Sequence, residues 1–574
     1  MRGSPLHEAV PYTSSQPASL DADTNVPGGR MRITKVKITN FKCYEDTFSL
    51  VLNEGLNIIV GSNESGKTTI LEAIQLALTG LLNGRSLRND QAGYLFNLSA
   101  QEKYVKSLGT AAPLPPPAIT IELFFSGGAS ELAELEGDGN SEKAKVSGVV
   151  YKIEFDEENY KDAYDELLKA GEVRSIPVEY YSVGIKSFAR KGITPRNIPI
   201  KSALIDSSST RLQNGSDVYV SRIIRDALEE HERASISQAH RKLKEAFLDD
   251  KDLQVINERI TSAAKISNKA VSIAVDLSSQ TAWESSLMTY IDLIPFQYIG
   301  KGEQCVIKTK LALSAKKNAE ATAILLEEPE NHLSHTRLNE LIADLTEQHS
   351  QKQIIISTHS SFVANKLGLE HLIVLRNGKV TRIAELVASD FFKRLAGYDT
   401  LRLTLARKAI LVEGDSDELV VQRAYMDANK GRLPIQDGID VISVGTAFLR
   451  FLELANKLQI PVAVVTDNDG DVAAVAAKYV DYDGSNTIKI CFDPIVDSGL
   501  LKTKDKPYNY NTLEPKLLKA NNLAALNGVL NTSKKTDDEL RIHMRANKTE
   551  TALAIFNSKT SINYPDYIIK AITP

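Results

Sequence analysis

Residues 61–68, GSNESGKT, constrain the fold of this chain more than any other segment. They follow the apolar run 56–60 and precede residues 69–78, which favour a helix, so they lie at a strand-to-helix turn. Backbone N–H groups can wrap a triphosphate at such a turn only if glycines, here Gly61 and Gly66, allow a close approach. The sequence therefore predicts a P-loop that binds ATP. The alternative is a glycine-rich surface turn, which the flanking strand and helix disfavour.

The polar residues of the P-loop predict how the nucleotide is held. Lys67 is expected to reach the β- and γ-phosphates, and the Thr68 hydroxyl to coordinate Mg²⁺. The other nucleotide-binding residues expected in this stretch are Asn63, Gly66 and Thr69.

Length and composition set the outer bounds. The 574 residues, 43% hydrophobic and 25% charged, suffice for three or four domains of an ordinary globular protein. A net charge of -5 argues against a uniformly basic coat for nucleic acid, so any DNA-binding surface must be local. Cys43, Cys305 and Cys491 lack metal-ligand spacing, which indicates a reducing cytoplasm rather than disulfides or zinc.

Neither a membrane span nor a signal peptide is expected. No apolar run approaches the ~20 residues that span a bilayer. Residues 1–30 are rich in Pro, Ser, Gly and Asp and lack the apolar centre of a signal peptide. They are expected to form a disordered leader, with Met31 as an alternative start.

From Met31 onward, residues 31–215 are assigned to the first part of an α/β ATPase. Period-two patterns predict strands at 33–41, 48–52, 119–125 and 149–155. Residues 127–147 are rich in Gly, Glu, Asp and Lys and are expected to form a solvated loop.

Residues 216–280 are assigned to a helical insertion. Apolar residues recur there at helical spacing, at Val220, Ile223, Ile224, Ala227 and Leu228. Periodicity identifies a buried face without saying what covers it, so the insertion either packs on the ATPase or dimerises with a second copy of the chain. No heptad pattern persists long enough for an extended coiled coil.

The ATPase resumes in residues 281–404. An apolar run at 323–326 ends in Glu327-Glu328-Pro329-Glu330, the arrangement of a Walker B strand. Glu327 is expected to hold Mg²⁺, and Glu328 to polarise the attacking water. A second apolar run ends at Ser357-Thr358-His359-Ser360, where His359 is a candidate γ-phosphate sensor.

The order of P-loop, EEPE and STHS resembles the ABC-type ATPase superfamily, in the branch shared by RecF-like, SMC-like and OLD (overcoming lysogenisation defect) proteins. Glu327 stands where most of that superfamily has Asp. Residues 299–304, IGKGEQ, are similar to the signature loop LSGGQ, with Gly300 in place of the usual Ser. The resemblance implies that this loop of one subunit closes on the ATP of another, through Gly300, Lys301, Gly302 and Glu303. It therefore implies at least a homodimer, with residues 331–335 crossing the interface.

In the last third, residues 405–574, two apolar runs end in acidic turns. Residues 409–412 lead into Glu413 and Asp417, and residues 461–465 lead into a run with acids at alternate positions. The strand ends would gather hard oxygen ligands for Mg²⁺, with Mn²⁺ or Ca²⁺ as alternatives. The predicted metal ligands here are Glu413, Asp417, Asp467, Asp469 and Asp471.

The two acidic turns resemble a Toprim domain, and an ABC-type ATPase followed by Toprim is the OLD arrangement. This resemblance implies a further ligand, Glu514, and a catalytic lysine, Lys548. The expected fold is thus α/β: an ABC/SMC-like ATPase head with a helical, dimerising insertion, followed by a Rossmann-like Toprim domain. The layout is similar to the nuclease subunit of Gabija anti-phage systems.

The implied function is an ATP-binding and ATP-hydrolysing, divalent-metal-dependent DNA endonuclease that nicks double-stranded DNA and acts in anti-phage defence or DNA processing. Its catalytic residues would be Glu328, His359, Glu413, Asp417, Asp467, Asp469, Glu514 and Lys548. The alternative is an ATP-gated DNA clamp whose acidic pocket binds metal without cutting. A helicase or reverse transcriptase encoded nearby is a candidate partner.

Overall fold

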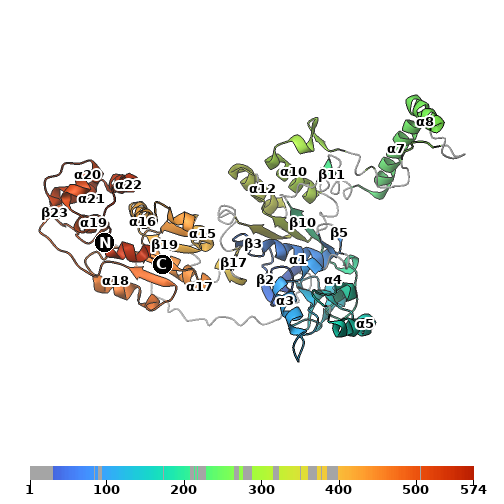
Figure 1. Cartoon of the computed structure of the whole chain (residues 1–574), viewed down its shortest axis with the longest axis horizontal. Helices are drawn as coiled ribbons and strands as arrows, with labels where there is room; N and C mark the ends of the chain where they lie inside the picture. Colours follow the sequence, from blue (N-terminus) through green and yellow to red (C-terminus); the bar gives the residue numbers. More distant parts are fainter. Residues whose placement is uncertain are drawn as a thin grey trace, which may run out of the picture.

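The computed structural model of the chain is shown in Figure 1. It describes residues 30–82, 85–87, 93–171, 173–206, 212–213, 216–217, 228–263, 271–275, 283, 288–314, 322–331, 333–348, 351–359, 371–376, 378–383, 398–503 and 506–573. The expected leader lies outside these residues except for Arg30. Among the helices that are described, none is long and apolar enough to cross a membrane.

The first sheet is antiparallel and contains all four strands expected in the first 160 residues. Its central strand β1 pairs with β2 on one side and β6 on the other, and β6 pairs with β8, which carries β7 and β9. Ile33, Val36 and Ile38 of β1 are fully buried. The strands are β1 (Arg32–Thr39), β2 (Phe48–Val51), β6 (Ile119–Ser126), β7 (Glu136–Gly137), β8 (Val146–Phe155) and β9 (Tyr181–Ser187).

The second sheet carries the segments with predicted ATPase motifs. Its order is β10-β15-β16-β3-β17-β18, parallel except for the antiparallel edge strand β18. Because β15, β16 and β3 are neighbours and parallel, their carboxyl ends lie side by side. The strands are β3 (Leu56–Gly61), β10 (Ser202–Asp206), β15 (Ala323–Glu327), β16 (Gln353–Thr358), β17 (Leu372–Arg376) and β18 (Lys379–Arg382).

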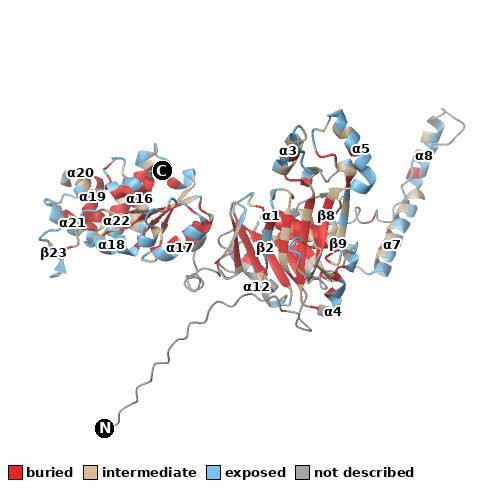
Figure 2. Cartoon of the chain, turned by 90° about the horizontal axis from the view of Figure 1, so that it is seen from below, coloured by how far each residue is buried: buried red, intermediate tan, exposed pale blue. Residues whose placement is uncertain are grey.

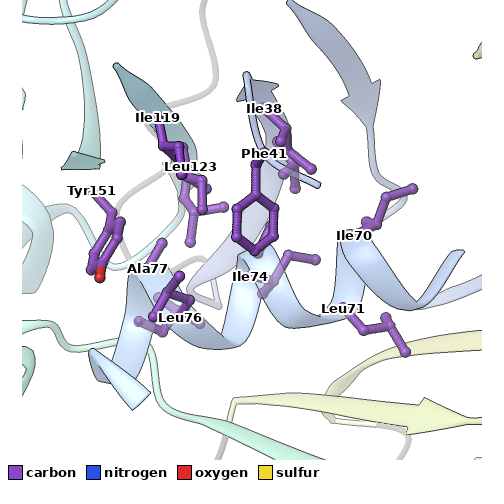
Figure 3. Close-up of a cluster of buried hydrophobic side chains, with 14 of the residues drawn as sticks. Ile38, Phe41, Ile70, Leu71, Ile74, Leu76, Ala77, Ile119, Leu123 and Tyr151 are labelled. Carbon is purple, nitrogen blue, oxygen red and sulfur yellow. The ribbon is translucent and has the colours of Figure 1, made fainter. Parts of the chain in front are cut away.

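Helix α1 (Lys67–Thr79) packs between the two sheets and contacts strands of both. It lies within the continuous buried region of Figure 2. Figure 3 shows its apolar side chains meeting residues of the first sheet, among them Ile38, Ile119 and Leu123. This two-sided burial explains why the helix reads as almost continuously apolar rather than amphipathic.

The prediction that residues 127–147 form a solvated loop is wrong. The segment contains α4 (Ala129–Leu132), a 3₁₀ turn (Ala133–Leu135) and β7, and Leu132 and Leu135 are buried. Gly137 lies so close to the backbone of Phe188 that a Cβ there would be 2.2 Å from the Phe188 carbonyl oxygen. Composition predicted solvent exposure here, but its few apolar residues pack against the first sheet.

The predicted insertion is largely helical in its described residues, apart from β12 (Ser216–Asp217) and the irregular residues 271–275. It forms α7 (Glu230–Leu248) and α8 (Lys251–Ala263), which project away from the two sheets in Figures 1 and 2. None of the residues of α7 is buried, and Leu243, Phe247 and Val255 are exposed. These three side chains are therefore not covered in the described chain, whereas Leu253 of α8 is buried. Val220, Ile223, Ile224 and Ala227 lie outside the described residues.

The remaining elements of the ATPase part surround the sheets or form short hairpins. The helices are α3 (Leu98–Ser107), α5 (Glu157–Ala170), α10 (Lys301–Ser314) and α12 (His335–Gln348). The two-residue strands are β4 (Leu81–Leu82), β5 (Arg85–Ser86), β11 (Leu212–Gln213), β12 (Ser216–Asp217), β13 (Tyr290–Ile291) and β14 (Ile294–Pro295).

The C-terminal part is built on a parallel four-stranded sheet of order β20-β19-β21-β22, with helices on its faces. Its strands are β19 (Lys408–Val412), β20 (Ile439–Ser443), β21 (Val462–Val465) and β22 (Ile488–Cys491), followed by the hairpin β23 (Lys502–Thr503) and β24 (Lys506–Pro507). Its helices are α15 (Tyr398–Leu405), α16 (Asp415–Ala428), α17 (Phe448–Leu458), α18 (Val472–Lys478), α19 (Leu513–Ala520), α20 (Leu523–Leu530), α21 (Asp537–Ala546), α22 (Lys548–Asn557) and α23 (Asp566–Ile572). The expected α/β class is confirmed.

The two parts are joined through Arg376, the last residue of β17. Its guanidinium donates to the carbonyl oxygens of Ala406 at 2.7 Å and Arg407 at 3.2 Å, directly before β19. One residue earlier, Leu375 pairs with Gly61 of the P-loop. The P-loop is therefore linked to the start of the C-terminal sheet by one strand pairing and the Arg376 side chain.

Candidate functional site

The P-loop connects β3 to α1, as the sequence predicts. Gly66 adopts the left-handed conformation (φ +95°), and a Cβ there would lie 2.5 Å from the Tyr44 hydroxyl, so only glycine fits. The buried Lys67 ammonium donates to the carbonyl oxygens of Gly61 and Ser62, both at 2.9 Å. Asn63 is exposed in the same loop, whereas Thr69 is buried.

Acids from the far end of the ATPase part surround this lysine. Burial lowers the pKa of Lys67, and the negative charges of Glu328, Glu330 and Glu327 oppose that shift. The Thr68 hydroxyl donates to Glu327 Oε1 across 259 positions of sequence. The two residues predicted to share a Mg²⁺ ion are thus in direct contact.

Glu328 and His359 also meet at this edge of the sheet. Glu328 has a left-handed backbone (φ 40°), and its N–H donates to the Ser357 carbonyl oxygen at 2.9 Å. His359 Nδ1 lies 3.2 Å from Glu328 Oε1. Asn331 Nδ2 donates to Glu328 Oε2 at 3.0 Å, so the loop after Walker B contacts Glu328 of its own chain. His332 of that loop lies outside the described residues.

Glu330 is a residue of this site that the sequence reading left without a role. Its Oε1 accepts from the Thr358 hydroxyl at 2.5 Å and from the His359 N–H at 3.1 Å, and it lies 3.4 Å from His359 Nδ1. Glu330 therefore fixes the end of β16 against the Walker B turn. The available signal was its spacing, because Glu328 and Glu330 are alternate residues around Pro329.

The predicted signature loop lies at the start of α10. Gly300 precedes the helix and has open space around it, so the serine usual at this position would fit. The buried Gln304 anchors the loop by donating to the carbonyl oxygens of Gln297 at 3.3 Å and Ile299 at 3.0 Å. Lys301 contacts Gln304 at 3.5 Å, whereas Gly302 is half-buried and Glu303 exposed.

The predicted acids of the C-terminal part come from the ends of adjacent parallel strands. Glu413 follows β19, and Asp417 lies in the first turn of α16, where its Oδ2 accepts from the Gly414 N–H at 3.1 Å. Asp467 and Asp469 follow β21, the strand beside β19. The edge shared by β19 and β21 therefore collects four carboxylates.

Glu514 and Lys548 join this acid cluster from two helices. Glu514 is buried in the first turn of α19, and its Oε2 accepts from the Thr512 hydroxyl at 3.2 Å. Lys548 is the first residue of α22, and its Nζ lies 3.3 Å from Glu514 Oε1. Lys548 is exposed, but the ion pair directs it toward the acids.

Burial and the charges of neighbouring acids raise the pKa values of Asp417 and Asp467. The pKa of Asp417 is raised to about 6, first by burial and then by the charges of Glu413 and Glu514, against the Gly414 N–H and Lys548. The pKa of Asp467 is raised well above its ordinary value by burial and then by Asp417, Glu413, Asp469 and Glu514. Glu413, Asp417, Asp467, Asp469 and Glu514 are the acid cluster.

The chemistry of the acid cluster suits a divalent metal, whereas its geometry does not define the ligands. Burial and neighbouring negative charges raise the pKa values of Asp417 and Asp467. Carboxylates gathered in this way are suitable donors for a hard cation, which would relieve their repulsion. Among the described residues, however, no three His, Cys, Asp or Glu side chains converge closely enough to hold a metal ion. The donor set therefore fits, and the exact ligand set stays a prediction.

Asp471 has a different position from the other predicted ligands. Its Oδ1 accepts from the Ala474 N–H at 2.9 Å, which caps the N-terminus of α18. Asp469 and Gly470 both have left-handed backbones (φ 46° and 89°), so the chain turns sharply before Asp471.

A polar network behind the Asp467–Asp469 turn was not found from the sequence. The buried Asn468 donates to the carbonyl oxygens of Asp493 at 2.6 Å and Ile495 at 3.1 Å, and accepts from the Gly470 N–H at 3.0 Å. The buried Lys516 ammonium pairs with Asp493 Oδ2 at 2.7 Å. An asparagine between two acids was the available signal for such a backbone-holding role.

Each of the two parts is similar to a known protein family. A family model described as AAA domain matches residues 35–357, more than half of the 574 residues. A second, described as Overcoming lysogenization defect protein-like, TOPRIM domain, matches residues 405–469.

Two curated relatives match short segments. DNA replication and repair protein RecF of Lactococcus lactis subsp. cremoris (strain MG1363) is 38% identical over 98 residues, which are 17% of this chain and 25% of that protein. The DNA double-strand break repair Rad50 ATPase of Methanopyrus kandleri is 50% identical over 46 residues, which are 8% of this chain and 5% of that protein. The matches thus cover a quarter or less of the length of these two relatives.

Solved structures with partial similarity include an SMC head domain and a RecF protein. The SMC head domain from Thermotoga maritima is 15% identical, with a TM-score of 0.27, and the match covers 61% of this chain and 97% of that one. The recombination mediator protein RecF with ATP is 12% identical, with a TM-score of 0.33, and the match covers 62% of this chain and 99% of that one.

Proposed function

We propose that the chain is an ATP-binding and ATP-hydrolysing endonuclease that nicks double-stranded DNA with divalent metal ions. The chain belongs to the AAA-domain family and joins this ATPase to an OLD-like Toprim domain. The observation that carries this proposal is the acid cluster. Its five carboxylates come from two strand ends and two helices and interact electrostatically, and Lys548 lies beside one of them. A structural fold does not need so costly an arrangement, whereas phosphodiester hydrolysis does.

The acid cluster would hold Mg²⁺, with Mn²⁺ or Ca²⁺ as alternatives. When bound, such ions supply an activated water and stabilise the leaving 3′-oxygen. The raised pKa values of Asp417 and Asp467 mean that these carboxyls retain protons until a cation or a rise in pH removes them. Lys548, 3.3 Å from Glu514, offsets negative charge on the reacting phosphoryl group.

In the ATPase, Lys67 would hold the nucleotide phosphates, and Thr68 and Glu327, already in contact, would hold its Mg²⁺. Glu328 would orient the attacking water, with His359 3.2 Å away as its neighbour near the γ-phosphate. Residues 300–303 would close on the nucleotide of a second subunit. The exposed apolar residues of α7 and α8 are suited to contact that subunit, which makes the homodimer part of the proposal.

The proposed setting is the cytoplasm, in anti-phage defence or DNA processing, alone or beside a helicase or reverse transcriptase encoded nearby. The three cysteines are free, which suits a reducing compartment. The two matched relatives are a replication and repair protein and a double-strand break repair ATPase, both of which work on DNA by name.

The second candidate is an ATP-gated DNA clamp whose acidic pocket binds metal without cutting. The two candidates differ in one product, because a nuclease converts supercoiled plasmid to nicked circles and a clamp retards the plasmid unchanged.

The test incubates supercoiled plasmid with the purified chain in Mg²⁺, in Mn²⁺ and in excess EDTA. Nicking in metal and none in EDTA is the expected result. The nicked circles should be sealed by DNA ligase, because hydrolysis that releases the 3′-oxygen leaves a 3′-hydroxyl and a 5′-phosphate. Plasmid that is bound and never nicked in either metal would establish the clamp instead.

A further inference from the structure

Beside the acid cluster, two arginines of α21 lie over two tyrosines of the segment before α19. The Arg545 guanidinium is 5.3 Å from the centre of the Tyr508 ring, and the Arg541 guanidinium is 5.3 Å from the centre of the Tyr510 ring. The two tyrosine rings contact each other edge to face, with their centres 5.2 Å apart. Each arginine therefore has an aromatic support, an arrangement that orients the planar guanidinium group.

The tyrosines are held firmly next to the acids. Tyr508 is buried and donates to the Arg541 carbonyl oxygen at 3.3 Å. Gly499 permits the close approach of Tyr510, since a Cβ there would be 2.3 Å from its ring. Between the tyrosines, Asn509 Nδ2 donates to Asp469 Oδ1 at 2.9 Å. The segment that supports the arginines is thus bonded directly to the acid cluster.

The two arginines differ in their other partners. Arg541 is paired with Asp538 at 2.8 Å and Asp537 at 3.6 Å on its own helix. Arg545 is exposed, and in the described part of the chain no carboxylate forms an ion pair with it. Stacking occupies one face of the Arg545 guanidinium and leaves its N–H edge available to an external anion.

Arg545 is also close in sequence to Lys548. Lys548 follows it by three residues, begins α22 and reaches Glu514 Oε1 at 3.3 Å. Burial and then the charge of Glu514 raise the pKa of Tyr508 to about 12, while Arg545 and Arg541 oppose that shift. Glu514 and Arg545 therefore act on the same ring.

We propose that Arg545, supported by Tyr508, binds a backbone phosphate of duplex DNA beside the phosphodiester that the acid cluster cleaves. This inference rests on the proposed nuclease function and names a positioning residue for its substrate. A carboxylate cluster repels DNA until metal is bound, so a nearby exposed cation supplies an attraction that does not depend on metal. A chain with a net charge of -5 needs such a local contact.

The test measures binding of a short labelled duplex by fluorescence anisotropy, over a range of salt concentrations, with the full chain carrying Asp467→Asn so that the DNA is not cut. Arg545→Gln is compared with Arg450→Gln. Arg450 is an exposed arginine of α17, which lies at the opposite end of the C-terminal part from α21 in Figures 1 and 2. The two variants remove the same charge.

Arg545→Gln is expected to weaken binding roughly tenfold and to reduce the slope of log affinity against log salt by about one, and Arg450→Gln to change neither. Arg545→Lys should restore the slope, because it restores the charge, but only part of the affinity, because lysine cannot stack or bind a phosphate through two N–H groups. A purely structural role for Arg545 would leave the slope unchanged.

Equal affinities and slopes for Arg545→Gln and Arg450→Gln would overturn the phosphate contact while leaving the nuclease proposal intact. No binding of duplex by the parent chain at any salt concentration would overturn both. In the cutting-competent chain, Arg545→Gln should raise KM for plasmid nicking and leave kcat within about twofold; a loss confined to kcat contradicts a positioning role.

Discussion

Asp417→Asn is expected to make the metal-free protein more stable while abolishing nicking. Folding raises the pKa of the Asp417 carboxyl from 3.8 to about 6. Between these two pH values the folded chain keeps a proton that the unfolded chain has lost, so rising pH destabilises the fold and the full penalty is present above about pH 6. Asparagine keeps an acceptor for the Gly414 N–H and cannot ionise.

The size of the effect follows from the same two pKa values. At about 1.4 kcal/mol per pKa unit, the shift from 3.8 to about 6 corresponds to about 3 kcal/mol. For a cooperative unit of about 150–250 residues, such a difference moves Tm by roughly 6–12 °C. The stabilisation of Asp417→Asn over wild type should therefore approach that size at pH 8 and be small near pH 4.

Scanning calorimetry in EDTA at several pH values, followed by Mg²⁺ addition, measures this. Mg²⁺ should raise the Tm of wild type more than that of Asp417→Asn and so narrow the gap at pH 8. Asp481→Asn, which removes an exposed acid from the same part of the chain, is the control and should give a small difference independent of pH. An Asp417→Asn variant that is no more stable than wild type at pH 8 would refute the account of a strained acid cluster.

Further expectations concern the nucleotide site, Asp471 at the N-terminus of α18, the effect of nucleotide on nicking, and the contacts of Arg376 between the two parts. Lys67→Ala should lose nucleotide binding in a filter assay, whereas Glu328→Gln should bind ATP but hydrolyse it at least tenfold more slowly; normal turnover by Glu328→Gln would remove its proposed role. Asp471→Asn should keep nicking within about twofold, because asparagine caps a helix as well as aspartate does, and loss of nicking would instead make Asp471 a metal ligand. With free Mg²⁺ held constant, ATP and a non-hydrolysable analogue should slow nicking relative to no nucleotide; equal rates would remove the coupling, and faster nicking with the analogue would reverse its sign. Arg376→Ala should weaken that nucleotide effect while leaving nicking without nucleotide unchanged, since it removes the contacts to Ala406 and Arg407, and an unaltered effect would exclude this path.

The local sequence was sufficient to predict a feature where contiguous residues determine its structure. The P-loop was predictable because a strand, two glycines and a helix are contiguous, and Gly66 has the left-handed backbone that only glycine adopts easily. The Walker B strand and the end of β16 were predictable because fully buried parallel strands read as unbroken apolar runs.

Prediction failed where tertiary contacts or turns override a local pattern. Acids at alternate positions suggest one face of a strand, but β21 ends at Val465, and the left-handed turn at Asp469 redirects Asp471 to cap a helix. Glu330 acts through contacts with β16, and Asn468 through contacts with the segment after β22, so neither role is visible in neighbouring residues. The segment 127–147 looked solvated because its few buried residues are outnumbered by charged ones.

The most direct test of the account is whether nicking and nucleotide binding separate in one protein. Asp467→Asn and the control Asp481→Asn would each be assayed for plasmid nicking in Mg²⁺ and for binding of a fluorescent ATP analogue. The account predicts that Asp467→Asn loses nicking by at least a hundredfold and binds nucleotide like wild type, while Asp481→Asn retains both. Nicking by Asp467→Asn at the wild-type rate would contradict the assignment of the acid cluster as the nuclease centre.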